Sequence, residues 1–217
     1  MNVTADRSTL PTGARFWDRI ASRYARKPIK DGRAYERMLD RLLEILRPGD
    51  RVLELGCGTG STALVLAQAV EHITATDYSR EMISIARSKL DRNAPGNIEF
   101  LQADAAEIIA LEAFDAIFAT SLLHLVDDVP VVLDRAFRQL KPGGLLITKT
   151  VCLKHMSPMI GAVVPILSWL RLAPRVAKLS LADLQAEFDR AGFAIEGIEY
   201  FDKDQFNPFI IALRPLD

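Results

Sequence analysis

The chain of 217 residues carries 27 basic and 28 acidic side chains, which gives a formal net charge of −1. Hydrophobic residues make up 49% and charged residues 25%, a composition that excludes an intrinsically disordered chain. Two cysteines and three histidines provide neither a zinc-finger spacing nor a disulfide framework, so no metal site is expected. The length suits one large domain with its own hydrophobic core.

Charge is distributed unevenly along the chain. Residues 1–50 carry 11 basic and 7 acidic side chains, whereas residues 51–150 carry 9 and 13. Residues 151–182 are again basic, so two basic segments flank an acidic middle. The balanced total argues against a nucleic-acid partner.

No stretch has the length or character of a membrane or secretion signal. The first residues are polar, and the uncharged run 155–170 is short and contains two prolines. We therefore expect a cytoplasmic protein whose membrane contact is at most peripheral. The oligomeric state stays open.

The first predicted elements are two helices. The first covers Ala14–Lys27, and the second begins at Asp31 and stops at Pro48-Gly49, because apolar residues recur there at three- and four-residue steps. We interpret residues 1–49 as a helical lid and residues 50–217 as the main domain.

From Arg51 onward, strands and helices alternate. The predicted strands are Arg51–Leu55, Ile73–Thr76, Asn97–Leu101, Phe114–Ala119 and Leu145–Val151. The predicted helices between them are Ser61–Val70, one capped by Ser79, and Val129–Leu140. This alternation predicts a parallel sheet with helices on both faces.

The end of the chain breaks this alternation. A helix over Leu181–Ala191 is followed by two strands, Phe193–Phe201 and Phe206–Leu213, which we expect to pair as a hairpin. The predicted class is therefore α/β, a Rossmann-like, doubly wound, mixed seven-stranded sheet with a C-terminal antiparallel hairpin. Residues 152–180 form an insertion.

A glycine-rich turn follows the first predicted strand. Within VLELGCGTG, Gly56, Gly58 and Gly60 permit positive φ angles and a close approach of the backbone to a ligand. Ligands of doubly wound folds bind at the carboxyl ends of the strands, where this turn lies.

Acidic side chains end the next two predicted strands. Asp77 follows the second strand, where a carboxylate can accept hydrogen bonds from both ribose hydroxyls of a nucleoside. Asp104 follows the third strand and can accept from an adenine amine. Each aspartate alone also suits a helix cap or a solvated turn, but their joint placement favours a nucleoside site.

At this point the sequence resembles the class I S-adenosylmethionine-dependent methyltransferases. Four stretches carry the resemblance in order over roughly residues 50–151: VLELGCGTG, TATDYSREMISIA, FLQADAAEI, and FDAIFATSLLHLVDD with LKPGGLLITKT. The opening ARFWDRIASRYARKP and the LLHLVDD stretch are similar to the small-molecule branch related to quinone-biosynthesis methyltransferases.

The resemblance implies S-adenosylmethionine as cofactor and a set of residues that bind it. The glycine-rich turn, with Cys57, would bound the methionine part, and Glu54 would orient its ammonium group. Asp77 would bind the ribose, and Tyr78 and Met82 would pack on the adenine. Asp104 and the Ala105 amide would bind the edge of the adenine, and Thr120 would contact the methionine moiety.

The resemblance also implies in-line methyl transfer to a small acceptor, in which the protein mainly supplies alignment. His124, after the fourth strand, is the candidate base, although it also suits a role in orienting its loop. Tyr24 is a candidate lid residue over the cofactor and equally suits a core aromatic. The thiols of Cys57 and Cys152 are expected to be inert.

The acceptor pocket is expected between the N-terminal helices and insertion 152–180. Many apolar side chains in the insertion suit a hydrophobic acceptor, and they also suit ordinary packing of an added helix pair. Arg171, Arg175 and Lys178 would share one helical face, either solvated or turned towards an anionic acceptor or membrane surface.

Two other classes of function stay open. Gly58, Gly60 and Ala63 satisfy G-x-G-x-x-A, which is compatible with an NAD-dependent oxidoreductase. A cofactor-binding module without turnover is the third possibility, since a fold does not guarantee a reaction. DNA adenine methylation is unlikely because Asn207-Pro208-Phe209 lies in the last predicted strand.

Overall fold

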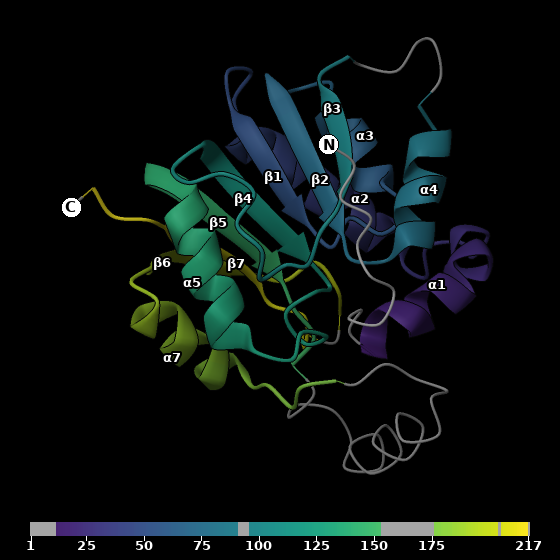
Figure 1. Ribbon diagram of the computed structural model, residues 1–217. Coiled ribbons are helices and arrows are strands. Elements are labelled where there is room, and N and C mark those ends of the chain that lie inside the picture. Colours follow the sequence, from purple (N-terminus) through teal and green to yellow (C-terminus); the bar gives the residue numbers. More distant parts are fainter. Residues whose placement is uncertain (1–11, 91–95, 153–175, 204, 217) are drawn as a thin grey trace.

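A computed structural model describes residues 12–90, 96–152, 176–203 and 205–216 (Figure 1). Its first elements are α1 (Thr12–Ala25) and α2 (Gly32–Ile45), close to the two predicted helices. The Asp31 side chain caps α2 by accepting a hydrogen bond from the Ala34 N–H at 3.0 Å.

The centre of the molecule is a seven-stranded sheet in the order β3-β2-β1-β4-β5-β7-β6. The strands are β1 (Arg51–Leu55), β2 (His72–Asp77), β3 (Ile98–Gln102), β4 (Phe114–Thr120), β5 (Leu140–Lys149), β6 (Ala194–Glu199) and β7 (Phe209–Leu213). β1 to β5 pair in parallel, whereas β7 is antiparallel to both β5 and β6. The predicted fold class, including its C-terminal hairpin, is confirmed.

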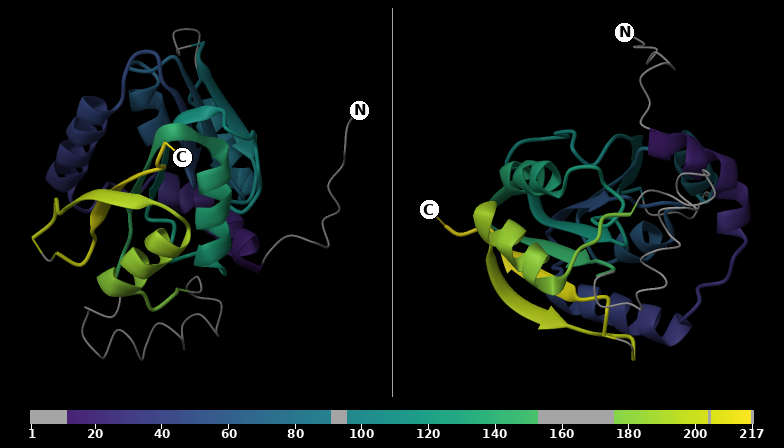
Figure 2. Two further views of the ribbon diagram at one scale, coloured as in Figure 1. Left: turned by 90° about the vertical axis from the view of Figure 1, so that its left-hand side faces the viewer. Right: turned by 90° about the horizontal axis from the view of Figure 1, so that it is seen from below.

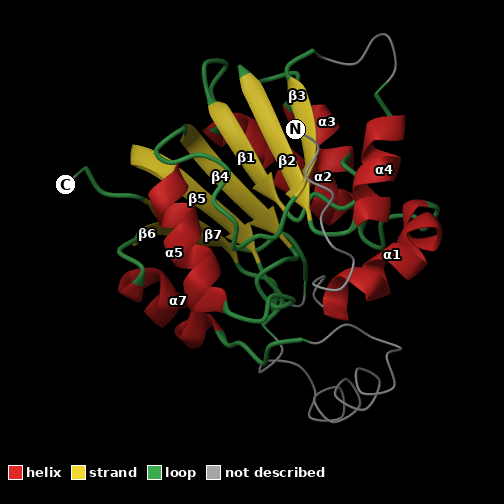
Figure 3. Ribbon diagram, in the orientation of Figure 1, coloured by secondary structure: helices red, strands yellow, loops and turns green. Residues whose placement is uncertain are grey.

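Helices cover both faces of the sheet (Figures 1 and 3). One face packs against α2, α3 (Ser61–Leu66) and α4 (Arg80–Ser88), and the other against α5 (Val129–Gln139) and α7 (Leu181–Arg190). Figure 2, seen from below, shows α2 and α5 on opposite sides of the sheet. Alternate residues of each central strand enter the two cores, as expected for strands that are buried on both faces.

Two predicted elements have different bounds. α3 ends at Leu66 rather than Val70, because the Asn97 amide from the chain entering β3 donates to the carbonyls of Ala67 and Val70 at 2.7 and 2.8 Å. β5 begins at Leu140, since Phe114 pairs with Leu140 before a bulge and Ala116 pairs with Leu145 after it.

Most of the predicted insertion, including its apolar residues, Arg171 and Arg175, lies outside the described residues. Residues 176–180 belong to no helix or strand, so Lys178 does not sit on a helical face. Ala177 N–H donates to the carbonyl of His124 at 2.8 Å, which joins this segment to the loop after β4. No helix of the described part is long and apolar enough to cross a membrane.

Candidate functional site

The glycine-rich turn after β1 has the backbone that its sequence predicts. Gly56, Gly58 and Gly60 have φ angles of 71°, 54° and 73°, a region that side chains rarely adopt. A Cβ atom on Gly60 would lie 2.6 Å from the Phe100 ring, so packing requires this glycine. A Cβ atom on Gly58 would meet nothing within 4 Å, so the backbone at this point faces open space.

Asp77, at the end of β2, holds this turn in place. One carboxylate oxygen accepts from the Gly58 N–H at 2.9 Å, and the other accepts from the Ser79 N–H at 2.8 Å. Burial raises the pKa of Asp77, the two N–H groups partly offset this rise, and the charge of Asp18 adds to it. Asp77 therefore joins the tips of β1 and β2 and keeps lone pairs for a ligand.

Glu54, on β1, is the most unusual polar group of the site. Its side chain is 2% exposed, and Oε2 has no hydrogen-bond partner among the described residues. Burial, and then the nearby charge of Asp77, raise the pKa of Glu54 to about 8. A buried carboxyl group without a partner is costly unless a cation or donor completes the site. The environment of Glu54 therefore fits the ammonium group of a ligand.

Aromatic hydroxyls from the N-terminal helices lie near these carboxylates. Tyr24 of α1 is 48% exposed, stacks edge-on with Trp17 at 5.9 Å, and has a pKa raised by partial burial and then by Asp77. Tyr35 of α2 shares a 3.0 Å hydrogen bond with the Thr62 hydroxyl, and burial followed by the charges of Glu54 and Tyr24 raises its pKa. The sequence gives no signal for Tyr35, because its position fits the repeat of apolar residues along α2.

α1 is fastened to the same site through α4. Asp18 accepts hydrogen bonds from the Ser79 hydroxyl at 2.6 Å and from the Glu81 N–H at 3.2 Å. The Ser79 hydroxyl also accepts from the Met82 N–H, which caps α4 as predicted. The sequence gives no signal for Asp18, because an acidic residue on a polar helix face looks like any solvated one.

The predicted adenine-side residues gather at the tips of β2 and β3. The Tyr78 ring packs on α1, where a Cβ atom on Gly13 would lie 2.6 Å from its hydroxyl, and Met82 is buried beneath. Burial raises the pKa of Tyr78 above its usual value. Asp104 accepts from the Ala106 N–H at 2.8 Å, beside Ala105, so it also shapes its turn.

The tip of β4 carries the remaining predicted residues. Thr120 ends β4 in register with Lys149 of β5. His124 is 8% exposed, and its Nδ1 has no partner among the described residues. Burial lowers the pKa of His124 to about 4, so its imidazole is neutral at physiological pH.

The two thiols lie in surroundings that disfavour a thiolate. Burial raises the pKa of Cys57 above its usual value and that of Cys152 to about 11. Over the described ranges, no three histidine, cysteine or acidic side chains gather to hold a metal ion.

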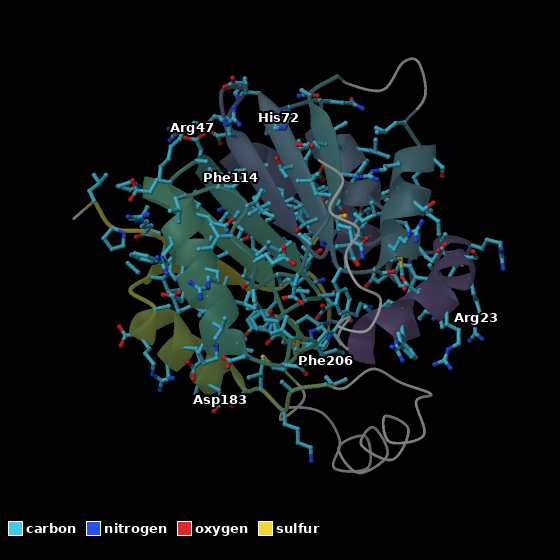
Figure 4. The ribbon with its side chains drawn as sticks, viewed as in Figure 1. Arg23, Arg47, His72, Phe114, Asp183 and Phe206 are labelled. Atoms are coloured by element: carbon cyan, nitrogen blue, oxygen red, sulfur yellow. The ribbon has the colours of Figure 1, made fainter. Side chains whose placement is uncertain are left out.

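Figure 4 shows His72 and Phe114 at the amino end of the sheet and Phe206 at the carboxyl end, so His72 lies away from the site.

Comparisons with known proteins identify the family. Residues 52–144 match the model of a methyltransferase domain. The arsenite methyltransferase of Halobacterium salinarum is 31% identical over 170 residues, which cover 76% of this chain and 42% of the relative. The ubiquinone/menaquinone biosynthesis C-methyltransferase UbiE of Vibrio campbellii is 38% identical over 106 residues, 46% of this chain and 41% of the relative. The chain thus spans less than half the length of these relatives.

Solved structures agree on the fold. A putative methyltransferase from Haloferax volcanii, in complex with the Trm112 activator, has a TM-score of 0.78 at 16% identity and covers 94% of this chain and 98% of that one. YcgJ from Bacillus subtilis has a TM-score of 0.66 at 26% identity, over 76% and 71%. The [4+2]-cyclase SpnF has a TM-score of 0.75 at 21% identity, and the match covers 95% of this chain and 97% of that one.

The domain match, the strand order and the glycine-rich turn agree with one another. Residues 52–144 form a methyltransferase domain, and the chain is similar to class I S-adenosylmethionine-dependent methyltransferases, including enzymes named for quinone biosynthesis.

Alanine substitutions at two glycines of the turn should separate binding from folding. Gly58→Ala adds a methyl group in open space and should weaken binding of S-adenosylhomocysteine at least about tenfold, with a loss of stability of about 1 kcal/mol from its positive φ. Gly60→Ala forces Cβ into Phe100 and Ala86 and should destabilise the fold more. Calorimetry and urea unfolding check this; equal effects of both variants on stability would contradict it.

Glu54 should make stability depend on pH. Its folded pKa of about 8 lies above the unfolded value, so its contribution is complete at acidic pH and is lost as pH rises through about 8. Glu54→Gln should therefore gain stability relative to the wild type with rising pH in cofactor-free urea unfolding. Parallel pH profiles of the two proteins would refute the shifted pKa.

Proposed function

We propose that this chain binds S-adenosylmethionine at the carboxyl ends of β1, β2 and β3 and transfers its methyl group to a small-molecule acceptor by in-line displacement. The observation that carries the proposal is Glu54, a buried carboxyl group with one oxygen that has no partner among the described residues; it lies near Asp77, which holds the open backbone of Gly58. The donor set of the site fits an ammonium, a ribose and a cationic sulfonium.

The proposed roles come from the family resemblance and are compatible with the environment of each residue. Glu54 would orient the ammonium group, and the turn with Gly56, Cys57 and Gly60 would enclose the methionine part. The remaining roles are those expected from the sequence. Asp77 would bind the ribose and Thr120 the methionine part, and Tyr24 would close over the cofactor. The adenine would be bound by Tyr78, Met82, Asp104 and Ala105. Tyr35 joins this set because its hydroxyl lies within electrostatic reach of Glu54 and Tyr24.

The bound cofactor would supply an activated methyl group, so the protein's task is alignment and exclusion of water. Asp77 would place negative charge near the cationic ligand, and the ligand's own charge would favour the ionised form of Glu54, whose pKa burial raises to about 8. His124 would accept a proton from an acceptor that must lose one, because its imidazole is neutral and its Nδ1 has no partner among the described residues.

A second candidate is a cofactor-dependent protein with a different reaction. The [4+2]-cyclase SpnF has this fold, which means that the fold alone does not fix the reaction. Turnover of radioactive methyl groups over a broad acceptor panel distinguishes the two candidates. An NAD-dependent oxidoreductase has less support, since the matching relatives are named as methyltransferases. We retain the expectation of a cytoplasmic protein with an apolar or anionic acceptor.

Asp77→Ala should weaken binding of S-adenosylmethionine by about a hundredfold, because it removes the ribose acceptor and the anchor of the Gly58 N–H. Asp115→Ala is the matched control: that carboxylate also accepts a backbone N–H, from Arg51 at 2.9 Å, but lies at the amino end of β4. Calorimetry on both variants checks the assignment; similar losses of affinity would refute it.

The rate of methyl transfer should report the pKa of His124. With an acceptor that is turned over, kcat should fall as pH decreases, with an inflection near pH 4 rather than at the usual pKa of histidine. The reason is that burial keeps His124 neutral down to that pH. His124→Gln should lower kcat about a hundredfold and leave KM for the cofactor unchanged. An unchanged kcat would refute the role of the His124 imidazole as a base.

A further inference from the structure

A polar cluster lies at the carboxyl end of β5, outside the cofactor residues. The Lys149 ammonium is 3.6 Å from Oδ2 of Asp202, which belongs to the turn between β6 and β7. The same Asp202 oxygen accepts a hydrogen bond from the Asn207 amide at 2.8 Å. One carboxylate oxygen thus positions both the lysine and the asparagine.

The cluster is next to the predicted methyl-transfer region. Lys149 pairs in register with Thr120, and residues paired directly across a sheet point to the same face. Phe118 and Ile147, two residues earlier on each strand, enter the core under α2. Lys149 therefore projects from the carboxyl end of β5 on the side of the sheet that α2 covers. Glu54 lies on the same face of the sheet.

The hydrogen bonds of this cluster are incomplete. Asp202 Oδ1 and Asn207 Oδ1 are buried without a partner in the described part of the chain. The Lys149 ammonium has three donors, and 3.6 Å is too long for a hydrogen bond to Asp202. Its side chain is 17% exposed, so water or a ligand oxygen can complete its hydrogen bonds. The two buried Oδ1 atoms are acceptors, and leaving them without a donor is costly.

The charges around Lys149 narrow the chemistry of that ligand. Asp202 already offsets much of the positive charge, and Arg41 of α2 is neutralised by Glu199 and Glu44 at 3.0 and 2.9 Å. Arg37 of α2 donates to the Phe201 carbonyl, which holds the turn against that helix. A partly neutralised ammonium suits a hydroxyl oxygen that can ionise better than a permanent anion.

We propose that Lys149, positioned by Asp202 and Asn207, binds a phenolic or enolic hydroxyl of the acceptor and favours its ionised form. This rests on the proposed function, since the ionised oxygen would make the acceptor a better nucleophile in methyl transfer. The proton of the hydroxyl would pass to solvent or to a base. A cation a few ångströms from a hydroxyl lowers the pKa of that hydroxyl by about one to three units.

The test uses 4-nitrophenol, whose phenolate absorbs visible light, with protein saturated with S-adenosylhomocysteine. Bound probe should ionise about one pH unit lower than free probe. Lys149→Met should abolish this shift. Asp202→Asn should enlarge it, because the competing carboxylate charge is gone. Lys141→Met is the control: Lys141 pairs with Asp115 at 2.8 Å, far from β5's carboxyl end, and should leave the shift intact.

Each other outcome overturns the proposal. No saturable binding of 4-nitrophenol, no shift in the wild type, an equal shift in Lys149→Met, or an equal loss in Lys141→Met would each do so. Asp202→Asn should enlarge the pKa shift of the probe, so this variant still tests the proposal if Lys149→Met does not fold. An unchanged or smaller shift in Asp202→Asn would contradict it. Calorimetry with S-adenosylhomocysteine on the same samples distinguishes the failures: absent cofactor binding refutes the proposed function, whereas intact binding without a shift refutes only the role of Lys149.

Discussion

The site depends on the two hydrogen bonds of the Asp77 carboxylate. They fix the Gly58 N–H on one side and the Ser79 N–H on the other, so the turns after β1 and β2 become one rigid unit. Ser79 extends this unit, because its hydroxyl caps α4 and donates to Asp18 of α1. α1, the glycine-rich turn and Asp77 are therefore connected by one chain of hydrogen bonds.

The fold accepts an electrostatic cost to place charge at this point. Glu54 and Asp77 are both buried, and the charge of Asp77 adds to the burial that raises the pKa of Glu54. Such perturbed groups are found in functional sites, where a ligand restores the balance. A cationic ligand at this point would favour the ionised form of Glu54, and low local hydration strengthens such an attraction.

The region proposed for the acceptor has a different electrical character. Lys149 lies beside the Asp202 carboxylate, and His124 is neutral because it is buried. Of the basic residues in the segment 151–182, only Lys178 falls within the described part, where it is exposed. Among the described residues, basic side chains such as Arg41, Lys141 and Lys149 form local ion pairs with carboxylates.

The sequence by itself determined the strand and helix order, the glycine-rich turn, the Ser79 cap and the tip residues Asp77 and Asp104, because these depend on local periodicity and backbone requirements. It did not determine Tyr35, Asp18 or Lys149 as parts of the site. Their significance depends on contacts between α1 and α4, α2 and α3, and β5 and the β6–β7 turn, which join residues far apart in the chain. Only the tertiary structure brings those side chains together, and burial by that structure, rather than residue type, sets the pKa values of Glu54 and His124.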